Sequence, residues 1–229
     1  MTDRRRSEAL VAYQQGLANS AKYQPEEQIR LKTRVFETFD SLLKHRGEPG
    51  LVPNLRLVDL GAADGALVEV CKQRGLVVTG LDAVDGIDFE KDAIPLPDAS
   101  VDVVTAVSII EHLRCANIFL SEIRRILRPG GSLLLVTPNW YYSWRDFYND
   151  PTHYHPYTPL SLAKELTNHG FSDIYVVPWI VKKPAWMWDL KYAFFVARWL
   201  IPFRGDAPAI VPEALKGRSG TILAFAKRT

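Results

Sequence analysis

A glycine-rich turn and a later aspartate are the first residues of this sequence whose types and spacing point to chemistry. Asp59 and Gly61 end a short apolar run, and small residues up to Gly65 lead into a helical pattern. Glycine allows the backbone to approach a ligand closely and to adopt positive φ angles. Asp82 ends the next apolar run, where an acid can bind both hydroxyls of a ribose. These residues predict a site for an adenosine-containing cofactor, although an ordinary strand-to-helix turn has similar glycines.

Nicotinamide-dependent dehydrogenases have an acid at the same position, so a second criterion is needed to distinguish NAD from other adenosine-containing cofactors. A dinucleotide fingerprint has the pattern GxGxxG, and this turn has Ala63 where the second glycine belongs. A pyrophosphate needs the close backbone approach that this glycine allows, and Asp64 near the helix start disfavours a phosphate there. The turn therefore indicates an adenosine cofactor other than NAD.

Two groups of titratable residues follow further along the chain. Glu111 and His112 come shortly after a β-branched run, and His153 and His155 lie in the proline-containing loop 150–159. An alcohol is a poor nucleophile until a base takes its proton, and histidine can do so near neutral pH. Each residue also has a purely structural interpretation. His112 would pack at a helix start, Glu111 would cap the helix, and the loop 150–159 would be a rigid surface loop. The four side chains also form a candidate metal set.

The elements around these residues alternate between short apolar runs and helical patterns. We expect helices at 25–47, 65–74, 116–127 and 158–169, and strands at 55–60, 76–81, 87–92, 101–107, 132–137, 174–177 and 221–226. Such alternation predicts an α/β fold with a mostly parallel sheet and helices on both faces. The long irregular segment before the last strand favours an antiparallel placement of that strand.

Composition excludes several other classes of protein. The chain has 229 residues, of which 47% are hydrophobic and 24% charged, and its net charge is +2. These are values of an ordinary globular domain, and they give no support for a nucleic-acid partner. Cys71 and Cys115 lack a CxxC neighbour, which argues against a disulfide framework or a four-cysteine metal site. The sequence has neither a secretory signal pattern nor a long uncharged apolar segment, so we expect a cytoplasmic protein.

Residues 179–219 are rich in aromatic side chains. A helical face with spacings of four, three and four residues is formed by Trp188, Tyr192, Phe195 and Trp199. We predict a helix over 186–203 that covers the sheet with one face. The other face closes the substrate pocket, forms a dimer contact or lies on a membrane surface, unless the insertion buries both faces itself.

Five motifs in chain order resemble the class I S-adenosylmethionine-dependent methyltransferases, in the branch known as type 11. The motifs are the turn 58–65, Asp82, and the segments 92–104, 108–113 and 123–139. The resemblance covers about residues 55–177 and the last strand. It implies a Rossmann-like, seven-stranded, mostly parallel sheet with the last strand antiparallel. It also implies S-adenosyl-L-methionine as the cofactor and one methyltransferase domain over 1–229, with an N-terminal helical segment 1–50 and the aromatic insertion 179–219.

The resemblance implies a set of cofactor contacts. They are Asp59, Gly61, Ala63 and Gly65 at the methionine part, Asp82 at the ribose, Ala83, Asp92 and Ala93 at the adenine, and Val107 beneath the cofactor. Few residues separate Asp82 from Asp92, where many members have a full helix. The sequence therefore predicts a thin wall on the adenine side.

The catalytic residues that we predict are His112, Glu111 and His153. Small-RNA 2′-O-methyltransferases and ubiquinone O-methyltransferases are similar here, but they have a second glutamate three residues before the Glu-His pair. This chain has Ser108 at that position, so we assign no metal.

The sequence says less about the identity of the methyl acceptor than about the cofactor. Aromatic residues that could stack on a ring or bury their own loop are Trp140, Tyr141, Tyr142, Trp144, Phe147 and Tyr148. The segments 137–139 and 150–153 resemble methyltransferases found among glycan-modifying proteins. We therefore expect O-methylation of a saccharide or small-metabolite hydroxyl. The alternatives are a non-catalytic accessory subunit and, with less support because the only basic cluster is Arg4–Arg6, an RNA 2′-O-methyltransferase.

Overall fold

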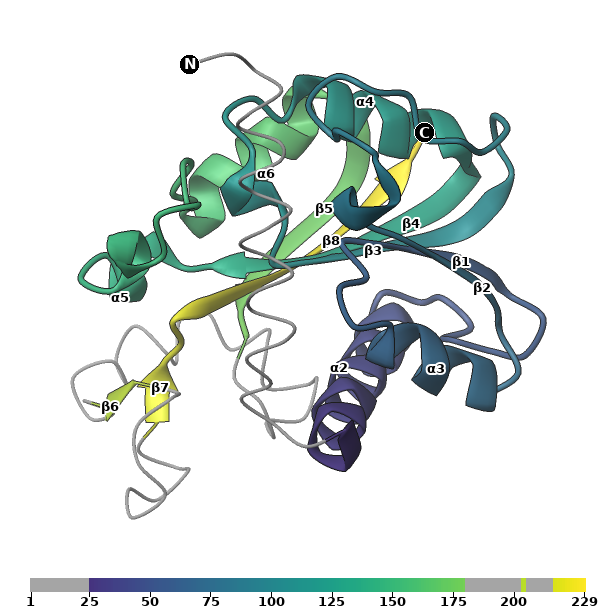
Figure 1. The fold of residues 1–229 in the computed structure, drawn as a ribbon, viewed down its shortest axis with the longest axis horizontal. Helices are drawn as coiled ribbons and strands as arrows, with labels where there is room; N and C mark the ends of the chain where they lie inside the picture. Colours follow the sequence, from purple (N-terminus) through teal and green to yellow (C-terminus); the bar gives the residue numbers. More distant parts are fainter. Residues whose placement is uncertain (1–24, 180–202, 205–215) are drawn as a thin grey trace.

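The structure is a computed structural model that describes residues 25–179, 203–204 and 216–229. A six-stranded sheet with the order β2-β1-β3-β4-β8-β5 lies at its centre (Figure 1). The strands are β1 (Arg56–Leu60), β2 (Val77–Leu81), β3 (Val101–Val107), β4 (Leu127–Pro138), β5 (Phe171–Pro178) and β8 (Thr221–Arg228). The strands β1 to β4 pair in parallel, and β8 pairs antiparallel with β4 and β5. The predicted α/β class and antiparallel last strand are confirmed.

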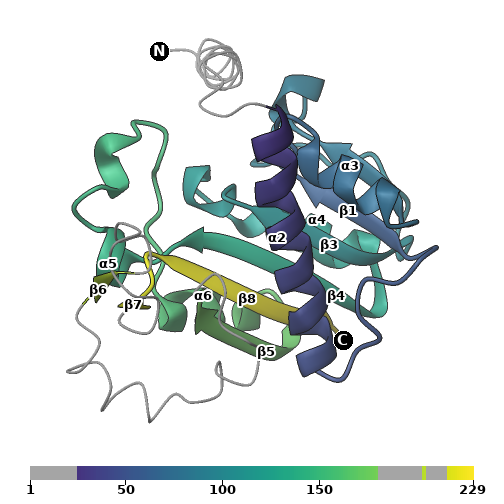
Figure 2. The ribbon, with the colours of Figure 1, turned by 90° about the horizontal axis from the view of Figure 1, so that it is seen from below.

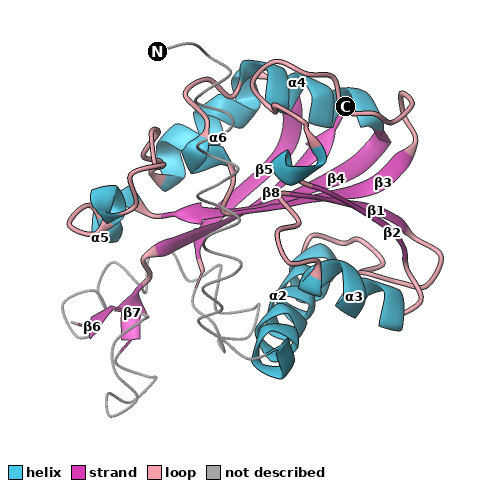
Figure 3. Cartoon of the chain, viewed as in Figure 1, coloured by secondary structure: helices cyan, strands magenta, loops and turns pink. Residues whose placement is uncertain are grey.

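Helices cover both faces of this sheet, as predicted. They are α2 (Pro25–His45), α3 (Ala66–Gln73), α4 (Asn117–Ile126) and α6 (Pro159–Asn168). One face carries α4 and α6, and the other carries α2 and α3 (Figure 3); Figure 2 shows α2 lying across the strands. Short helices follow the carboxyl ends of β2, β3 and β4: η1 (Ala83–Asp85), η2 (Ile110–His112), α5 (Trp140–Ser143) and η3 (Phe147–Asn149).

Local sequence explains where two of the helices begin. α2 starts at Pro25 with two glutamates in its first turn, and both features suit a helix N-terminus. Thr158 caps α6 through a reciprocal pair: its Oγ1 accepts from the amide of Ser161, and Ser161 Oγ accepts from the amide of Thr158. This cap fixes the point at which the histidine-containing loop ends.

Each face of the sheet has its own hydrophobic core. Phe119 and Leu162 belong with Leu60 to the core under α4 and α6. Phe39 belongs with Leu57 to the core under α2 and α3. Because successive side chains of a strand alternate between faces, Asp59 shares the second face with Leu57.

The predicted strand at 87–92 is wrong, and the described sheet has six strands rather than seven. The amide of Asp88 donates to the carboxylate of Asp92 at 2.8 Å, and the amide of Asp92 donates to the carbonyl of Asp88 at 2.7 Å. These local bonds use backbone groups that a sheet would need. The segment is a turn, and β2 is the last strand at this edge of the described sheet.

Most of the predicted aromatic helix lies outside the described residues, and so do its suggested dimer and membrane contacts. Phe203, which the prediction placed in that helix, instead lies in β6 (Phe203–Arg204), which pairs with β7 (Lys216–Arg218). Residues 1–24 of the predicted N-terminal segment also lie outside the described part. Among the helices that the structure describes, none has the length and apolarity needed to cross a membrane.

Candidate active site

The turn between β1 and α3 is built around two glycines with positive φ. Gly61 has φ +74° and Gly65 has φ +73°, which glycine adopts without steric strain. The amides of Gly61 and Ala62 donate to the carbonyl of Leu81 at 2.8 and 3.2 Å. A β-carbon on Gly65 would meet no atom within 4 Å, whereas one on Gly61 would lie 3.2 Å from Cδ1 of Ile109. The turn leaves open space at Gly65, which fits a ligand held against its backbone.

Asp82 connects this turn to the end of β2. Its buried carboxylate accepts from the amide of Ala63 through Oδ2 at 2.9 Å and from the amide of Val84 through Oδ1 at 3.3 Å. A carboxylate oxygen has about two acceptor positions, so capacity remains for hydroxyl groups. The geometry fits the ribose-binding role, which stays a prediction, as does the role of Ala83 in η1.

The side chain of Asp59 is enclosed in the core on the α2/α3 face. Thr105 Oγ1 donates to Asp59 Oδ1 at 2.7 Å, and both side chains are buried. Burial raises the pKa of Asp59 to about 6, although the hydrogen bond from Thr105 acts in the opposite direction. A contact of Asp59 with the methionine part of the cofactor stays a prediction.

Two of the three residues predicted to contact the adenine lie in exposed chain, and the third, Ala83, is partly buried. Asp92 and Ala93 are exposed, and Val107 at the end of β3 is partly buried. In the described chain only η1 and turns stand between β2 and β3, which agrees with the expected thin wall. The contacts themselves stay predictions.

Glu111 is a buried acid in η2, shortly after β3. Its side chain is 1% exposed, and Thr137 at the end of β4 donates to its Oε2 at 2.9 Å. Burial raises the pKa of Glu111 to about 7, although hydrogen bonds from Thr137 and Ser108 oppose the shift. Glu111 can therefore give or accept a proton near neutral pH.

The rings of His112 and His153 lie beside one another, with centroids 4.7 Å apart. Nδ1 of His112 is 2.8 Å from Thr152 Oγ1 and 3.2 Å from the Thr152 carbonyl oxygen, and Nδ1 of His153 is 2.7 Å from the carbonyl oxygen of Phe147. A carbonyl oxygen only accepts, so Nδ1 is the donor in both rings, and in the neutral rings Nε2 carries the basic lone pair. Burial and the neighbouring His153 lower the pKa of His112, which favours its neutral form.

The three residues predicted to be catalytic thus lie together. One candidate ligand atom each from Glu111, His112 and His153 lies within 4.8 Å of the others. His155 is exposed, and its ring packs against Tyr157 at 4.5 Å, so it does not join the group. The amide of His155 donates to the carbonyl of Glu111 at 3.0 Å, which holds the loop against η2. Two nitrogens and a carboxylate can transfer protons or bind a divalent cation.

Sequence reasoning gave no role to the polar residues that hold this group. Thr137 bonds Glu111, and Thr152 bonds His112 and also donates to Asp150 Oδ1 at 2.6 Å. The amide of Thr152 donates to the same Asp150 oxygen at 2.8 Å. An aspartate whose side chain accepts the amide two residues later is a common turn, and that signal could have drawn attention to Asp150 and Thr152.

A chain of aromatic contacts leads from the histidines to the surface. His153 lies 4.5 Å from Phe147, and Phe147 lies 5.0 Å from Tyr148, as centroid distances. Phe147 is buried, whereas Tyr148 is 58% exposed and Trp144 is 52% exposed. The aromatic segment therefore both packs its own loop and presents rings to solvent.

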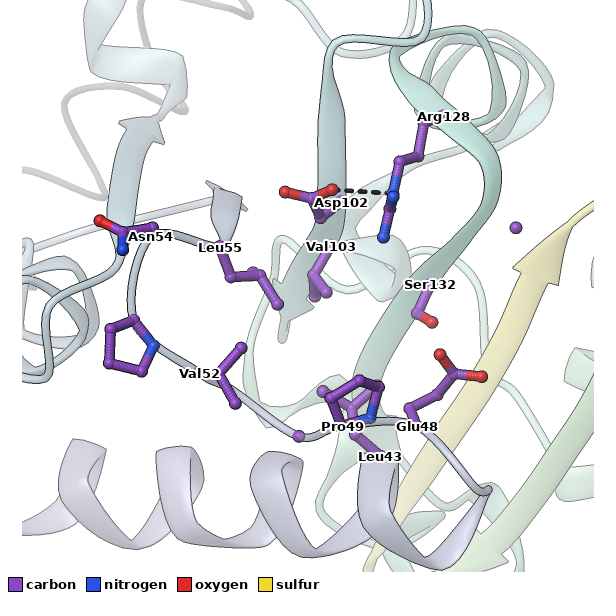
Figure 4. Close-up of a pocket in the computed structure, with 13 residues that line it drawn as sticks. Leu43, Glu48, Pro49, Val52, Asn54, Leu55, Asp102, Val103, Arg128 and Ser132 are labelled. Atoms are coloured by element: carbon purple, nitrogen blue, oxygen red, sulfur yellow. Dashed lines mark ion pairs between the residues drawn. The ribbon is translucent and has the colours of Figure 1, made fainter.

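A pocket of about 230 Å³ lies near the amino ends of the strands, at the other end of the sheet from the candidate active site (Figure 4). Leu55, Val103 and Ser132 line it beside the amino ends of β1, β3 and β4. Arg128 and Asp102 form an ion pair of 2.7 Å in its wall. Because open α/β sheets bind ligands at the carboxyl ends of their strands, this pocket is separate from the candidate active site.

Comparison with known proteins adds two relatives. Over 80 residues the chain is 44% identical to a probable S-adenosylmethionine-dependent methyltransferase of Mycolicibacterium smegmatis, covering 34% of this chain and 31% of the relative. Over 121 residues it is 28% identical to the ubiquinone biosynthesis O-methyltransferase of Maricaulis maris, covering 44% and 48%. The matches thus span about a third and about half of the length of these relatives.

The fold and a family model agree with these matches. The crystal structure of an S-adenosylmethionine-dependent methyltransferase from Mesorhizobium loti matches with a TM-score of 0.56 and 18% identity, covering 81% of this chain and 96% of that one. This likeness shows the fold. A family model described as a methyltransferase domain matches residues 21–176, more than half of the chain. The chain therefore belongs to the methyltransferase domain family, and it has the α/β fold that the resemblance to class I methyltransferases implied.

Proposed function

We propose that this protein transfers the methyl group of S-adenosylmethionine to a hydroxyl group of a saccharide or another small metabolite, in the cytoplasm. The observation that carries the proposal is the hydrogen bonding of His112 and His153 through Nδ1, which leaves Nε2 as the basic atom of each neutral ring. Both rings belong to the group that follows the carboxyl end of β3, at the same sheet edge as the glycine turn. A hydroxyl acceptor needs a base of this kind.

His112 is the proposed general base. S-adenosylmethionine, when bound, supplies a methyl group on a sulfonium sulfur that is open to in-line displacement. Nε2 of His112 would take the hydroxyl proton of the acceptor as the acceptor oxygen receives the methyl group that bound S-adenosylmethionine would supply. The lowered pKa of His112 keeps the ring able to accept that proton.

Glu111 and His153 complete the proposed catalytic group. A negative charge on Glu111, whose pKa burial raises to about 7, stabilises the positive charge that forms on His112. Nε2 of His153 lies 3.9 Å from Asp150 Oδ2, so a proton that reaches His153 also meets a nearby negative charge.

The exposed aromatic rings support a ring-bearing acceptor. Trp144 and Tyr148 present apolar faces with a polar edge, which suits both sugar rings and planar metabolites. The name of the Maricaulis maris relative records O-methylation in ubiquinone biosynthesis, in agreement with a hydroxyl acceptor. Cys71 and Cys115 are free thiols, which agrees with a reducing compartment.

A metal-assisted version of the reaction would use the same three residues. A divalent cation there would polarise the acceptor oxygen. Ser108 stands where the similar families have a second glutamate, and the one carboxylate of the group is 1% exposed and bonded to Thr137. We therefore base the proposal on proton transfer without a metal.

Matched acceptor panels test the proposed function. One panel contains free sugars, sugar nucleotides and phenols, and a second contains the same molecules with their hydroxyls blocked as ethers or replaced by amines. An RNA oligonucleotide forms a third arm. We expect S-adenosylhomocysteine to form with the first panel only, and NMR of the product to show a new O-methyl group. Turnover with the amines or RNA alone, or cofactor binding without turnover as in an accessory subunit, would refute the proposal.

A further inference from the structure

We propose that Asp150 and Thr152 are positioning residues that fix the tautomer of His112, so that the lone pair of its neutral ring is on Nε2. The inference rests on the proposed function, because it concerns the histidine that acts there as the base. It assigns a hydrogen-bonding role to each of two residues that the motifs include but give no role.

The first step is the direction of the bond between Thr152 and Asp150. Thr152 Oγ1 lies 2.6 Å from Asp150 Oδ1. Burial alone would raise the pKa of Asp150, but the hydrogen bonds from Thr152 and the nearby histidines lower it below its usual range. The carboxylate is therefore ionised at neutral pH and can only accept. The hydroxyl hydrogen of Thr152 must point to Asp150.

The second step is the bond between Thr152 and His112. Oγ1 of Thr152 lies 2.8 Å from Nδ1 of His112. Since the hydroxyl hydrogen is committed to Asp150, this oxygen can only accept from the ring. The carbonyl oxygen of Thr152, 3.2 Å from the same nitrogen, also only accepts. Both partners therefore require a hydrogen on Nδ1.

A hydrogen on Nδ1 of His112 determines the state of Nε2, the proposed basic atom. A neutral imidazole with its hydrogen on Nδ1 has its lone pair on Nε2, where it can accept the proton of an acceptor. Without the charge of Asp150, the Thr152 hydroxyl could rotate and donate to Nδ1 of His112, which would select the tautomer that cannot accept a proton at Nε2. In the serine protease triad an aspartate fixes a histidine tautomer directly; here the aspartate would act through a hydroxyl.

The local backbone keeps the two residues in this arrangement. Oδ1 of Asp150 accepts from the amide of Thr152 at 2.8 Å as well as from its hydroxyl, and Pro151 between them restricts the turn. Replacing Asp150 by alanine would therefore also disturb the turn. Thr152→Val is the cleaner variant, because it keeps the amide and the side-chain shape and removes only the hydroxyl.

NMR of protein labelled with ¹⁵N-histidine tests the tautomer without any acceptor. The chain has five histidines, and the signals of His112 are identified by their loss in His112→Ala. We expect the wild type to show a protonated Nδ1 and a bare Nε2 at a pH where the ring is neutral. Thr152→Val leaves only the longer bond to the residue's own carbonyl oxygen, 3.2 Å from Nδ1, and should shift part of the population towards a protonated Nε2, whereas Thr152→Ser should keep the wild-type pattern.

Rates with an acceptor form the second readout. We expect Thr152→Val to lower kcat by roughly threefold to tenfold, the size of one lost hydrogen bond, with the cofactor affinity and the acceptor KM kept. Thr152→Ser should restore kcat. Thr167→Val is the matched control, because Thr167 is an exposed residue of α6 whose hydroxyl bonds the carbonyl of Ala163; it should change neither readout.

The two readouts separate this inference from the proposed function. A wild-type tautomer in Thr152→Val overturns the inference, whatever happens to the rate, because a lower kcat would then report a structural role. A shifted tautomer supports the positioning role. If the tautomer shifts while His112→Ala keeps full activity, the positioning role holds and the proposed base is wrong.

Discussion

Thr105 donates a hydrogen bond of 2.7 Å to Asp59 across the paired strands β1 and β3, where both side chains are buried. The bond satisfies one carboxylate oxygen, but burial still raises the pKa of Asp59 from 3.8 to about 6. The core therefore holds an acid whose charged form is disfavoured, directly before the glycine-containing turn between β1 and α3.

The pH dependence of stability follows from this shift. Because the folded pKa lies above the unfolded one, the contribution of Asp59 is fully present below about pH 4 and is lost as the pH rises through about 6. Asp59→Asn keeps an acceptor for Thr105 and carries no charge. Its free energy of unfolding relative to wild type should therefore rise between pH 4 and pH 8, by an amount on the order of 3 kcal/mol. Urea unfolding at several pH values measures this, and a pH-independent difference would refute the account of Asp59.

Asp82 should contribute to cofactor affinity. Asp82→Ala removes a charged acceptor and the bond to the amide of Ala63, so S-adenosylmethionine binding should weaken by about 1–3 kcal/mol. Asp98→Ala is the control, because Asp98 is exposed and pairs with Arg125 away from this turn. Titration calorimetry compares the two variants, with thermal melts to check folding. Equal affinities for both variants would place the ribose elsewhere.

Gly65→Ala tests the open space at the turn. Its φ of +73° makes alanine strained, so unfolding should become easier by about 1 kcal/mol, and the added methyl should also weaken cofactor binding. Gly47→Ala is the matched control, since Gly47 has φ +81° and equally open surroundings but follows α2. It should show the same loss of stability and wild-type cofactor affinity. Equal cofactor affinity in the two variants would mean that the cofactor does not approach Gly65.

The sequence predicts a helix or strand correctly where the burial of apolar side chains alone determines the local structure. The β-branched run at 101–107 forms β3 with the predicted bounds, because a strand covered on both faces has a nearly continuous apolar sequence. At 87–92 the apolar residues Ile87 and Phe89 suggested a strand, but hydrogen bonds between Asp88 and Asp92 close a turn instead. Such local competition is not visible in hydrophobic periodicity.

The site was predictable in its residue types more than in its arrangement. Glu111 and His112 were identified by their position after a strand. The choice between His153 and His155 depends on the course of the loop, which long-range bonds to the carbonyl of Glu111 determine. Spacing in the sequence does not encode those bonds, so the roles of Asp150 and Thr152 were not predicted either.

Removal of metal ions should leave the reaction unchanged. The proposed base is His112, and the group that it forms with Glu111 and His153 needs no cation to accept a proton. We expect the rate of protein dialysed against a chelator to match that of untreated protein. Loss of activity that Mg²⁺ or Zn²⁺ restores would instead favour the metal-assisted version.

The most direct test of the account is the rate of methyl transfer by His112→Ala at saturating S-adenosylmethionine. With an acceptor identified from the hydroxyl panel, kcat should fall by roughly 10²–10⁴-fold, the usual contribution of a general base. Titration should show an unchanged cofactor affinity. His169→Ala, at the far end of α6, should keep the wild-type rate. A His112→Ala rate within twofold of wild type, with the product still methylated on oxygen, would contradict the claim that His112 takes the proton of the acceptor.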